Sequence, residues 1–172
     1  MNSRVEIETA RFLLRELTEA DATLRYLGWL ANLEARRFIL AAQQTQGLAE
    51  LAEYVRQRSN RLDVLFLGIF DKYSGLHIGN IKYEPLDSAQ GYAVMGILIG
   101  DPDFRGKGVA FEVLRASAQW LKTHRAINQV LLGVSIDNSS AIQAYKKVGF
   151  IEMASPHIKK AGPNTITMGW TL

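Results

Sequence analysis

The chain has 172 residues, of which 48% are hydrophobic and 22% are charged, a balance typical of a folded domain. Its formal net charge is only +3, and Lys and Arg are spread along the chain, which argues against a nucleic-acid partner. The apolar runs are too short to cross a membrane, and the N-terminus lacks an apolar signal segment. Without cysteine there is neither a disulfide framework nor a thiolate metal site. We therefore expect one cytoplasmic domain over residues 1–172 that uses neither membrane nor nucleic acid.

The first third of the chain is expected to form one strand and two helices. Residues 5–14 alternate loosely between apolar and polar and predict the strand. Thr18 stands three residues before Asp21, which is typical of a capping box at the start of a helix. Apolar residues at helical spacing continue from there to Leu33. A second apolar helix face predicts a helix over residues 47–59.

The rest of the chain alternates strands and helices. Strands are expected over 63–70, 77–83, 92–99, 130–136, 150–153 and 165–171, and helices over 110–122 and 139–148. Pro85 to Ala89 is expected to end the second of these strands. The strand–helix–strand run over 92–136 predicts a parallel pair joined by a crossover. The order as a whole predicts an α/β domain with a mixed sheet flanked by helices.

A glycine-rich turn follows the strand over 92–99 and leads directly into a helix. It reads Arg105-Gly106-Lys107-Gly108-Val109-Ala110. The N-terminus of a helix holds phosphate through its unpaired N–H groups, and glycine lets a pyrophosphate approach the backbone. The turn lacks the third glycine and following acid of a dinucleotide fingerprint, and the Lys-Ser/Thr ending of a phosphate loop. By itself the turn is equally compatible with a plain tight connection.

The turn resembles the Arg/Gln-x-x-Gly-x-Gly/Ala motif of the GNAT acetyltransferases. Downstream, Asn138 is followed seven residues later by Tyr145 and then by Gly149-Phe150, which is similar to the later motif of that family. The opening Arg11-Phe12-Leu13-Leu14-Arg15 resembles the RimJ/RimL-like branch, which acetylates protein N-termini. Two further segments, 78–82 and 96–100, resemble GNAT enzymes that acetylate amino sugars. The two likenesses imply different acceptors.

The resemblance implies acetyl-CoA as cosubstrate, no metal, and a central, mostly antiparallel sheet with one splayed strand pair that holds the pantetheine arm. It implies that Tyr145 protonates the leaving thiolate, and that Asn138 binds the pantetheine arm. The residues 106–110 would hold the pyrophosphate. The cofactor-binding residues so implied are Leu98, Ile99, Arg105, Gly106, Lys107, Gly108, Val109, Ala110 and Asn138. Tyr145 and Asn138 also have structural interpretations, as a core-packed tyrosine and as a helix N-cap.

The general base is less clearly indicated. Relatives in this branch carry an acid on the strand where Val94 and Met95 stand here. Glu84 and His77 are the candidate bases that remain, with His157 as a third. An acceptor amine that arrives neutral is the alternative. The histidines show no spacing typical of metal ligands.

The predicted reaction is direct acetyl transfer to a primary amine, either a peptide N-terminus or an amino sugar. The helical region 21–59 and the loops 85–90 and 156–164 are expected to shape the acceptor site. Its candidate aromatic residues are Trp29, Phe38, Tyr83 and Tyr92. A non-catalytic acyl-CoA sensor on the same fold and an unrelated nucleotide-binding domain are the alternatives. An exposed last strand would allow pairing in a homodimer.

Overall fold

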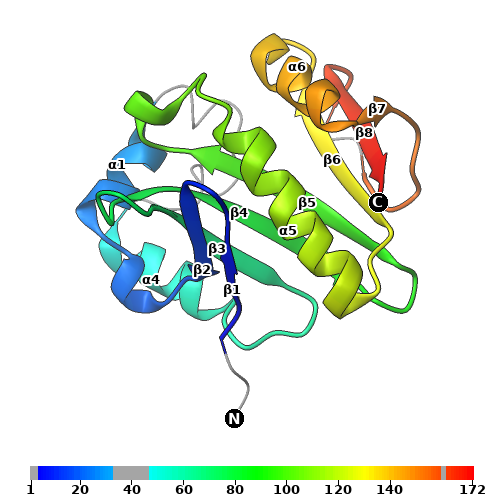
Figure 1. Cartoon of the computed structure of the whole chain (residues 1–172). Helices are drawn as coiled ribbons and strands as arrows, with labels where there is room; N and C mark the ends of the chain where they lie inside the picture. Colours follow the sequence, from blue (N-terminus) through cyan, green and yellow to red (C-terminus); the bar gives the residue numbers. More distant parts are fainter. Residues whose placement is uncertain (1–3, 33–46, 160–161) are drawn as a thin grey trace.

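The computed structural model describes residues 4–32, 47–159 and 162–172. Its strands form one eight-stranded sheet in the order β1-β2-β3-β4-β5-β6-β8-β7 (Figure 1). The strands are β1 (Glu6–Glu8), β2 (Phe12–Glu16), β3 (Leu65–Asp71), β4 (His77–Asp87), β5 (Tyr92–Ile99), β6 (Gln129–Ser135), β7 (Ile151–Glu152) and β8 (Thr165–Thr171). The α-helices are α1 (Leu24–Ala31), α4 (Leu48–Arg56), α5 (Val109–Arg125) and α6 (Ser139–Val148).

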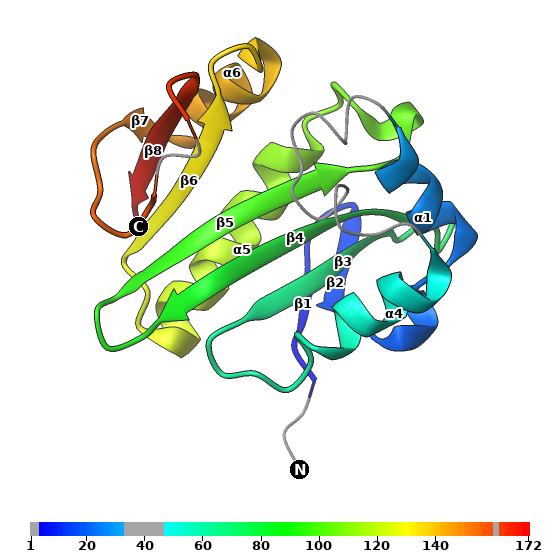
Figure 2. The same cartoon turned by 180° about the vertical axis from the view of Figure 1, so that it is seen from behind.

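The sheet is mixed and mostly antiparallel, as expected. β5 and β6 form its parallel pair, and every other neighbouring pair of described strands is antiparallel. α5 is the crossover between the two parallel strands. Figure 2 shows α1 and α4 on one face of the sheet and α5 behind it. The α/β fold class predicted from the element order is confirmed.

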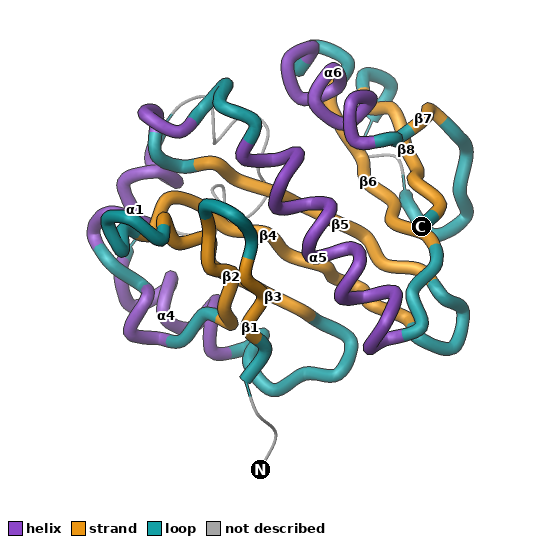
Figure 3. The backbone as a smooth tube through the Cα atoms, in the orientation of Figure 1, coloured by secondary structure: helices purple, strands orange, loops and turns teal. Residues whose placement is uncertain are grey.

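The covering helices divide the core into two clusters. The larger one packs α5 against the sheet through residues such as Val113, Leu114 and Ile81, all of them fully buried. The smaller one joins α1 and α4 to the opposite face through residues such as Tyr26 and Leu51. The tube in Figure 3 shows the long α5 running across one face of the sheet. Apolar residues recurring at helical spacing explain why each helix buries one side.

Three sequence predictions are corrected by the fold. The expected strand over residues 5–14 is two antiparallel strands, β1 and β2, joined by a turn at 9–11. β4 continues through Pro85 to Asp87, because a bulge between Tyr83 and Leu86 takes up the proline, which cannot donate a ladder hydrogen bond. The last strand, β8, lies between β6 and β7, so it is not the exposed edge that a dimer would use.

The helix start predicted at Thr18 is a short 3-10 turn, Glu19–Asp21, and α1 begins only at Leu24. The capping box itself is present: the backbone N–H of Thr18 donates to the Asp21 carboxylate at 2.8 Å. Arg15 also binds that carboxylate at 2.7 Å, and it holds the pKa of Asp21 below its usual range although burial alone would raise it. No helix in the described residues is long and apolar enough to span a bilayer.

Candidate active site

The two parallel strands separate towards their C-terminal ends. They pair only from Tyr92 opposite Gln129 to Val94 opposite Leu131. Both strands continue for several residues beyond the last pair, and Figure 2 shows them diverging in that direction. Strand ends that separate in this way leave backbone N–H and C=O groups without a ladder partner. The opening between β5 and β6 is therefore a place where an extended polar chain can bind.

The opening is flanked by two helix N-termini, because α5 follows β5 and α6 follows β6. α5 starts at Val109, and its N-cap, Gly108, offers no side-chain cap to the first N–H groups. Gly106 and Gly108 have φ values of 69° and 74°, in the left-handed region that favours glycine. Uncapped N–H groups and the positive end of a 17-residue helix make a site for an anion. This geometry fits a pyrophosphate.

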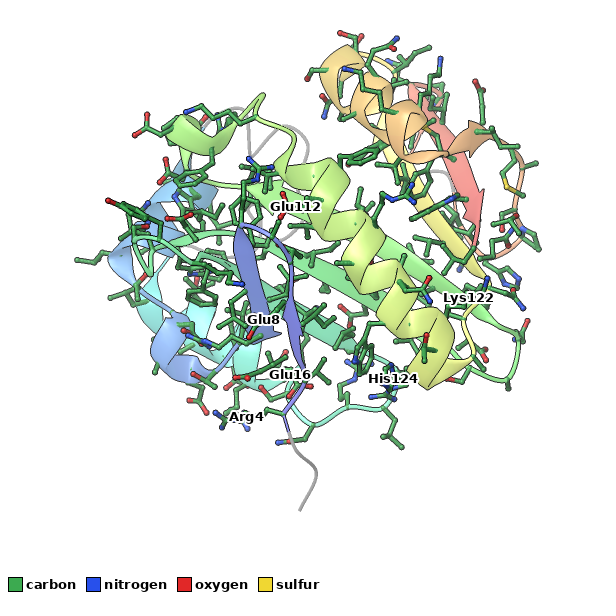
Figure 4. All side chains as sticks on the ribbon, viewed as in Figure 1. Arg4, Glu8, Glu16, Glu112, Lys122 and His124 are labelled. Carbon is green, nitrogen blue, oxygen red and sulfur yellow. The ribbon has the colours of Figure 1, made fainter. Side chains whose placement is uncertain are left out.

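The glycine-rich turn is held from outside by the β1–β2 turn. Arg11 and Thr9 both contact Glu112 in the first turn of α5, with Arg11 Nε 2.7 Å and Thr9 Oγ1 2.7 Å from its carboxylate. Arg11 Nη1 also donates to the carbonyl of Lys107 at 3.1 Å. Figure 4 labels Glu112 beside this turn. The side chain of Arg11 thus fixes the turn over 105–108, a contact between distant segments that the sequence did not indicate.

The arginine of the glycine-rich turn, Arg105, points to backbone carbonyl groups rather than outwards. Arg105 Nε donates to the carbonyl of Ile99 at 3.0 Å, and its Nη2 lies 3.3 Å from the carbonyl of Gly100. Its side chain therefore closes the end of β5 and ties the turn to the strand. Lys107 is exposed and remains a candidate phosphate ligand.

The ladder between β4 and β5 distinguishes Leu98 from Ile99. The N–H of Gly100 donates to the carbonyl of Ile78 at 2.9 Å, in the same register that places Leu98 opposite Asn80. Since backbone groups alternate along an antiparallel strand, those of Leu98 face β4 and those of Ile99 face the opening. The pairing therefore favours Ile99, and disfavours Leu98, as a backbone ligand of a bound chain.

The second motif lies on α6. Asn138 is the N-cap of this helix, and its Oδ1 accepts from the N–H of Ala141 at 3.3 Å. Tyr145 packs partly buried against the main core, with its ring 5.7 Å from that of Phe150. Its hydroxyl has no hydrogen-bond partner among the described residues, and burial raises its pKa to about 12. Tyr145 therefore keeps its proton at neutral pH, as a general acid must before the reaction.

The candidate base Glu84 is surrounded by cations. Its carboxylate lies 2.9 Å from Arg58, 3.0 Å from Lys82 and 3.4 Å from Arg61. Burial raises its pKa, but Lys82 and Arg58 outweigh burial, so the pKa of Glu84 lies below the ordinary value. A carboxylate with a lowered pKa is a weaker base than an ordinary one. These surroundings do not favour Glu84 for proton removal.

The candidate base His77 is buried on the face covered by α1. Its ring stacks on Phe70 at 4.7 Å and meets Trp29 edge-on at 5.0 Å. Nε2 lies 2.7 Å from Oδ1 of Asn80, while Nδ1 and the Asn80 amide nitrogen are buried without a partner. Burial lowers the pKa of His77, so its ring is neutral near pH 7. It packs as an aromatic residue of the smaller cluster.

The aromatic residues proposed for the acceptor site divide between core and surface. Tyr83 is fully buried, with its hydroxyl 2.7 Å from Ser117 on α5, and Trp29 belongs to the smaller core cluster. Both are corrected from pocket to core, where large aromatic side chains bury most area. Tyr92 is half-buried and stacks on the ring of His157 at 3.8 Å. Phe38 lies outside the described residues.

The comparisons with known proteins agree with this geometry. A family model described as an acetyltransferase (GNAT) domain matches residues 11–151. The chain is 27% identical over 94 residues to the uncharacterized N-acetyltransferase YobR of Bacillus subtilis, a match that covers 55% of the chain and only 36% of that relative.

Two solved structures show the same fold. RimL, a ribosomal L7/L12 alpha-N-protein acetyltransferase in complex with coenzyme A, superposes with a TM-score of 0.83 at 15% identity, over 98% of both chains. A chimera of the spermidine N-acetyltransferase SpeG from Vibrio cholerae and hSSAT superposes with a TM-score of 0.77 at 19% identity, over 94% of this chain and 96% of that one. By its family match over residues 11–151, this chain belongs to the GNAT family and carries an acetyltransferase domain of that family.

Proposed function

We propose that this chain transfers the acetyl group of acetyl-CoA directly to a primary amine, in the opening between β5 and β6. The observation that carries the proposal is the conjunction of that opening with the uncapped N-terminus of α5. A pyrophosphate bound at the turn of Gly106 and Gly108 would direct the pantetheine arm along β5. RimL, solved in complex with coenzyme A, has the same fold and supports coenzyme A as the ligand.

The residues present fit such a cosubstrate in three places. The N–H groups of residues 108–110 and the charge of Lys107 would hold the pyrophosphate. The N–H of Ile99 would meet the pantetheine amide, and Asn138 would stand at the other side of the opening. When bound, acetyl-CoA supplies a thioester carbonyl for the amine to attack. Direct transfer fits a chain without cysteine, which offers no thiol nucleophile.

Tyr145 is proposed as the general acid. As the amine nitrogen bonds to the acetyl carbon, the carbon–sulfur bond breaks and the thiolate takes the phenolic proton. The amine loses one proton to water, and Tyr145 regains its own from water. With a pKa of about 12, Tyr145 is protonated at every physiological pH. Because a thiol titrates near 8.5, proton transfer from Tyr145 to the thiolate is uphill. It must therefore accompany cleavage of the carbon–sulfur bond, and water must reprotonate the phenolate quickly.

We propose no side chain as the general base, since Glu84 is neutralised by cations and His77 is enclosed by aromatic rings. His157, stacked on Tyr92, remains a candidate. The simplest account is an amine that enters in its neutral form. In that case the rate follows the neutral fraction of the acceptor.

The acceptor is proposed to be a small primary amine or a peptide N-terminus. RimL and the SpeG chimera are named for different acceptors, a protein α-amino group and spermidine, on the same fold. The RimJ/RimL-like opening over residues 11–15 favours the first, and the likeness to amino-sugar enzymes favours a sugar amine. The fold therefore leaves the choice to side chains around the opening.

The test is thiol release from acetyl-CoA in the presence of amines, for wild type and Tyr145→Phe. Because the chain has no cysteine, a thiol reagent reads only free CoA. We expect Tyr145→Phe to lower kcat by about 100-fold or more, as for loss of a general acid, while CoA binding is retained. Tyr73→Phe is the matched control, because Tyr73 is 99% exposed. Equal rates in both variants would remove Tyr145 from the chemistry, and failure to bind CoA would overturn the proposal.

A further inference from the structure

The sheet is open at one position in the middle of its central strands. Gly96 on β5 is exposed, and a Cβ atom placed on it would have no neighbour within 4 Å among the residues that the structure describes. It lies two residues beyond Val94, where the pairing of β5 with β6 ends. Leu98, two residues further along and hence on the same face, packs with the cluster under α1 and α4. The space above Gly96 is thus on the face opposite α5 and beside the opening.

A cluster of polar side chains borders this space. Lys82 is the direct neighbour of Gly96 across the β4–β5 ladder, so the two residues point to the same face. Lys82 Nζ donates to the hydroxyl of Tyr54 at 2.8 Å and lies 3.0 Å from Glu84. Arg58 lies over the Tyr54 ring at 3.6 Å and donates to Glu84 at 2.9 Å. We call Tyr54, Arg58, Lys82 and Glu84 the acceptor-face cluster.

The acceptor-face cluster carries an excess of positive charge. Arg61 pairs with Glu84 and with Asp63, so in the described part of the chain three cations, Arg58, Arg61 and Lys82, share the two carboxylates of Glu84 and Asp63. Glu84 is shared by all three cations, so its negative charge is largely offset and attracts an incoming ammonium less. A cationic acceptor above Gly96 would also meet Lys82, the direct neighbour of Gly96 across the ladder.

The cations also retain unused donors. The ammonium of Lys82 has three N–H groups, and Tyr54 and Glu84 engage two of them. Nη2 of Arg58 makes no hydrogen bond to a described residue, whereas its Nε and Nη1 donate to Glu84 and to the carbonyl of Tyr54. The side chains of Arg58 and Lys82 are only 17% and 26% exposed, so their charges are less screened by water than those of surface residues.

We propose that the acceptor is an amine that also carries an anionic group, a carboxylate or a phosphate, a few bonds from its nitrogen. The anionic group binds Lys82 and Arg58, and the amine then stands above Gly96, at the opening. This inference rests on the proposed acetyl transfer and names the class of acceptor. The Cβ atoms of directly opposite residues on neighbouring strands are about 5 Å apart. We therefore expect a short separation between the amine and the anionic group of the acceptor. A polyamine such as spermidine, for which the SpeG acetyltransferase is named, carries the opposite charge and is disfavoured.

The experiment compares amines that differ only in the anionic group. The pairs are β-alanine with β-alaninamide and O-phosphoethanolamine with ethanolamine, and spermidine serves as the cationic probe. Rates of thiol release give kcat/KM for each, expressed per neutral amine so that differences in amine basicity cancel. We expect at least one anionic member to exceed its partner by tenfold or more, and spermidine to be the poorest. A preference within the β-alanine pair would indicate a carboxylate on the acceptor, and a preference within the phosphoethanolamine pair would indicate a phosphate.

Substitutions then assign the preference to the cluster. In Lys82→Met the ratio within the responding pair is expected to fall towards one, through a higher KM for the anionic amine. Arg56→Gln is the matched control: Arg56 lies on α4, the helix that carries Tyr54, is 57% exposed and pairs with Glu53. It should leave the ratio unchanged. A ratio that survives Lys82→Met, or that falls equally in Arg56→Gln, would overturn the assignment.

Propionate provides a test without any variant, should Lys82→Met fold poorly. This carboxylate has no amine, and we expect it to compete with the acceptor and not with acetyl-CoA. Competition with acetyl-CoA alone would contradict the inference, as would neutral amines that match or exceed their anionic partners. If no amine releases thiol although acetyl-CoA binds, acetyl transfer itself has failed and the inference falls with it. If neutral amines are acetylated well, only the inference about charge is lost.

Discussion

The two faces of the central sheet are made from the same strands but are covered differently. On the face under α5, Ile81 and Tyr83 of β4 are fully buried, and Met95 of β5 is nearly so. Lys82, between Ile81 and Tyr83 in the sequence, points to the opposite face and borders the open position at Gly96. The face under α5 is closed over these strands, whereas the other face has a core under α1 and α4 and, at Gly96, the open position proposed to receive an acceptor. Alternation along a strand allows both arrangements in one short segment.

The two faces should differ most in how far a substitution lowers the free energy of unfolding. Leu114→Ala, on α5 under the closed face, removes a fully buried side chain and should cost about 2–5 kcal/mol in the free energy of unfolding. Lys82→Met on the open face should cost less than about 1 kcal/mol, since its partner Glu84 keeps two arginines. Urea denaturation measures both. Equal costs would mean that the open face is as much a part of the core as the closed one.

Two tyrosines, Tyr83 and Tyr54, place their hydroxyl groups on opposite faces of the sheet. Tyr83→Phe removes a buried hydroxyl paired with Ser117 at 2.7 Å and should cost about 1 kcal/mol of stability without changing acetyl transfer. Tyr54→Phe removes the hydroxyl that accepts from Lys82 at 2.8 Å. It should change the KM for the acceptor more than the stability. Melting curves and steady-state kinetics of both variants test this, and the reverse pattern would exchange the roles of the two faces.

Acetyl transfer should tolerate alkaline pH. A tyrosine with an ordinary pKa near 10 is half ionised at pH 10, whereas Tyr145, with its pKa raised by burial to about 12, is only about 1% ionised. The rate should therefore rise as the acceptor amine loses its proton and then stay level through pH 10. A pH–rate profile of kcat measures this. A falling limb centred near pH 10 would contradict a protonated, buried Tyr145 as general acid.

The smallest expected effect is at Gly28 on α1. This glycine is exposed, and a Cβ atom placed on it would have no neighbour within 4 Å in the described ranges 4–32, 47–159 and 162–172. Alanine at a helix position should raise the stability by about 0.5–1 kcal/mol and leave kinetics unchanged. Thermal denaturation checks the increase. A loss of stability would show that α1 packs more closely than its open side suggests.

Much of the fold could be predicted from the sequence because its signals are local. β5, α6 and β8 have the predicted bounds, since each is a periodic apolar segment ended by turn residues. The β1–β2 turn was missed because it has neither glycine nor proline. Side-chain contacts hold it, from Thr9 and Arg11 to Glu112 a hundred residues later. The inner position of β8 likewise depends on strand order, which local patterns do not contain.

The candidate site divides in the same way. The glycine turn before α5 and the Asn138 cap of α6 are contiguous motifs, and both occupy the ends of the diverging strands. The acceptor-face cluster joins α4 to β4, and no spacing rule links Tyr54 to Lys82. Within the cluster, the sequence indicated only that Tyr54 and Arg58, four residues apart, would lie on the same side of a helix. The proposed cofactor contacts were thus readable from the sequence, whereas the proposed acceptor contacts required the fold.

The most direct test of the central claim follows both products of a single reaction. The chain is incubated with acetyl-CoA carrying a carbon-13 acetyl group and with the paired amines, and free thiol and labelled amide are counted together. We predict one labelled N-acetyl amine for each thiol released, with no label remaining on the protein. Thiol released without N-acetylated product would indicate hydrolysis. Acetyl-CoA bound without any release would contradict catalysis and favour a sensor on the same fold.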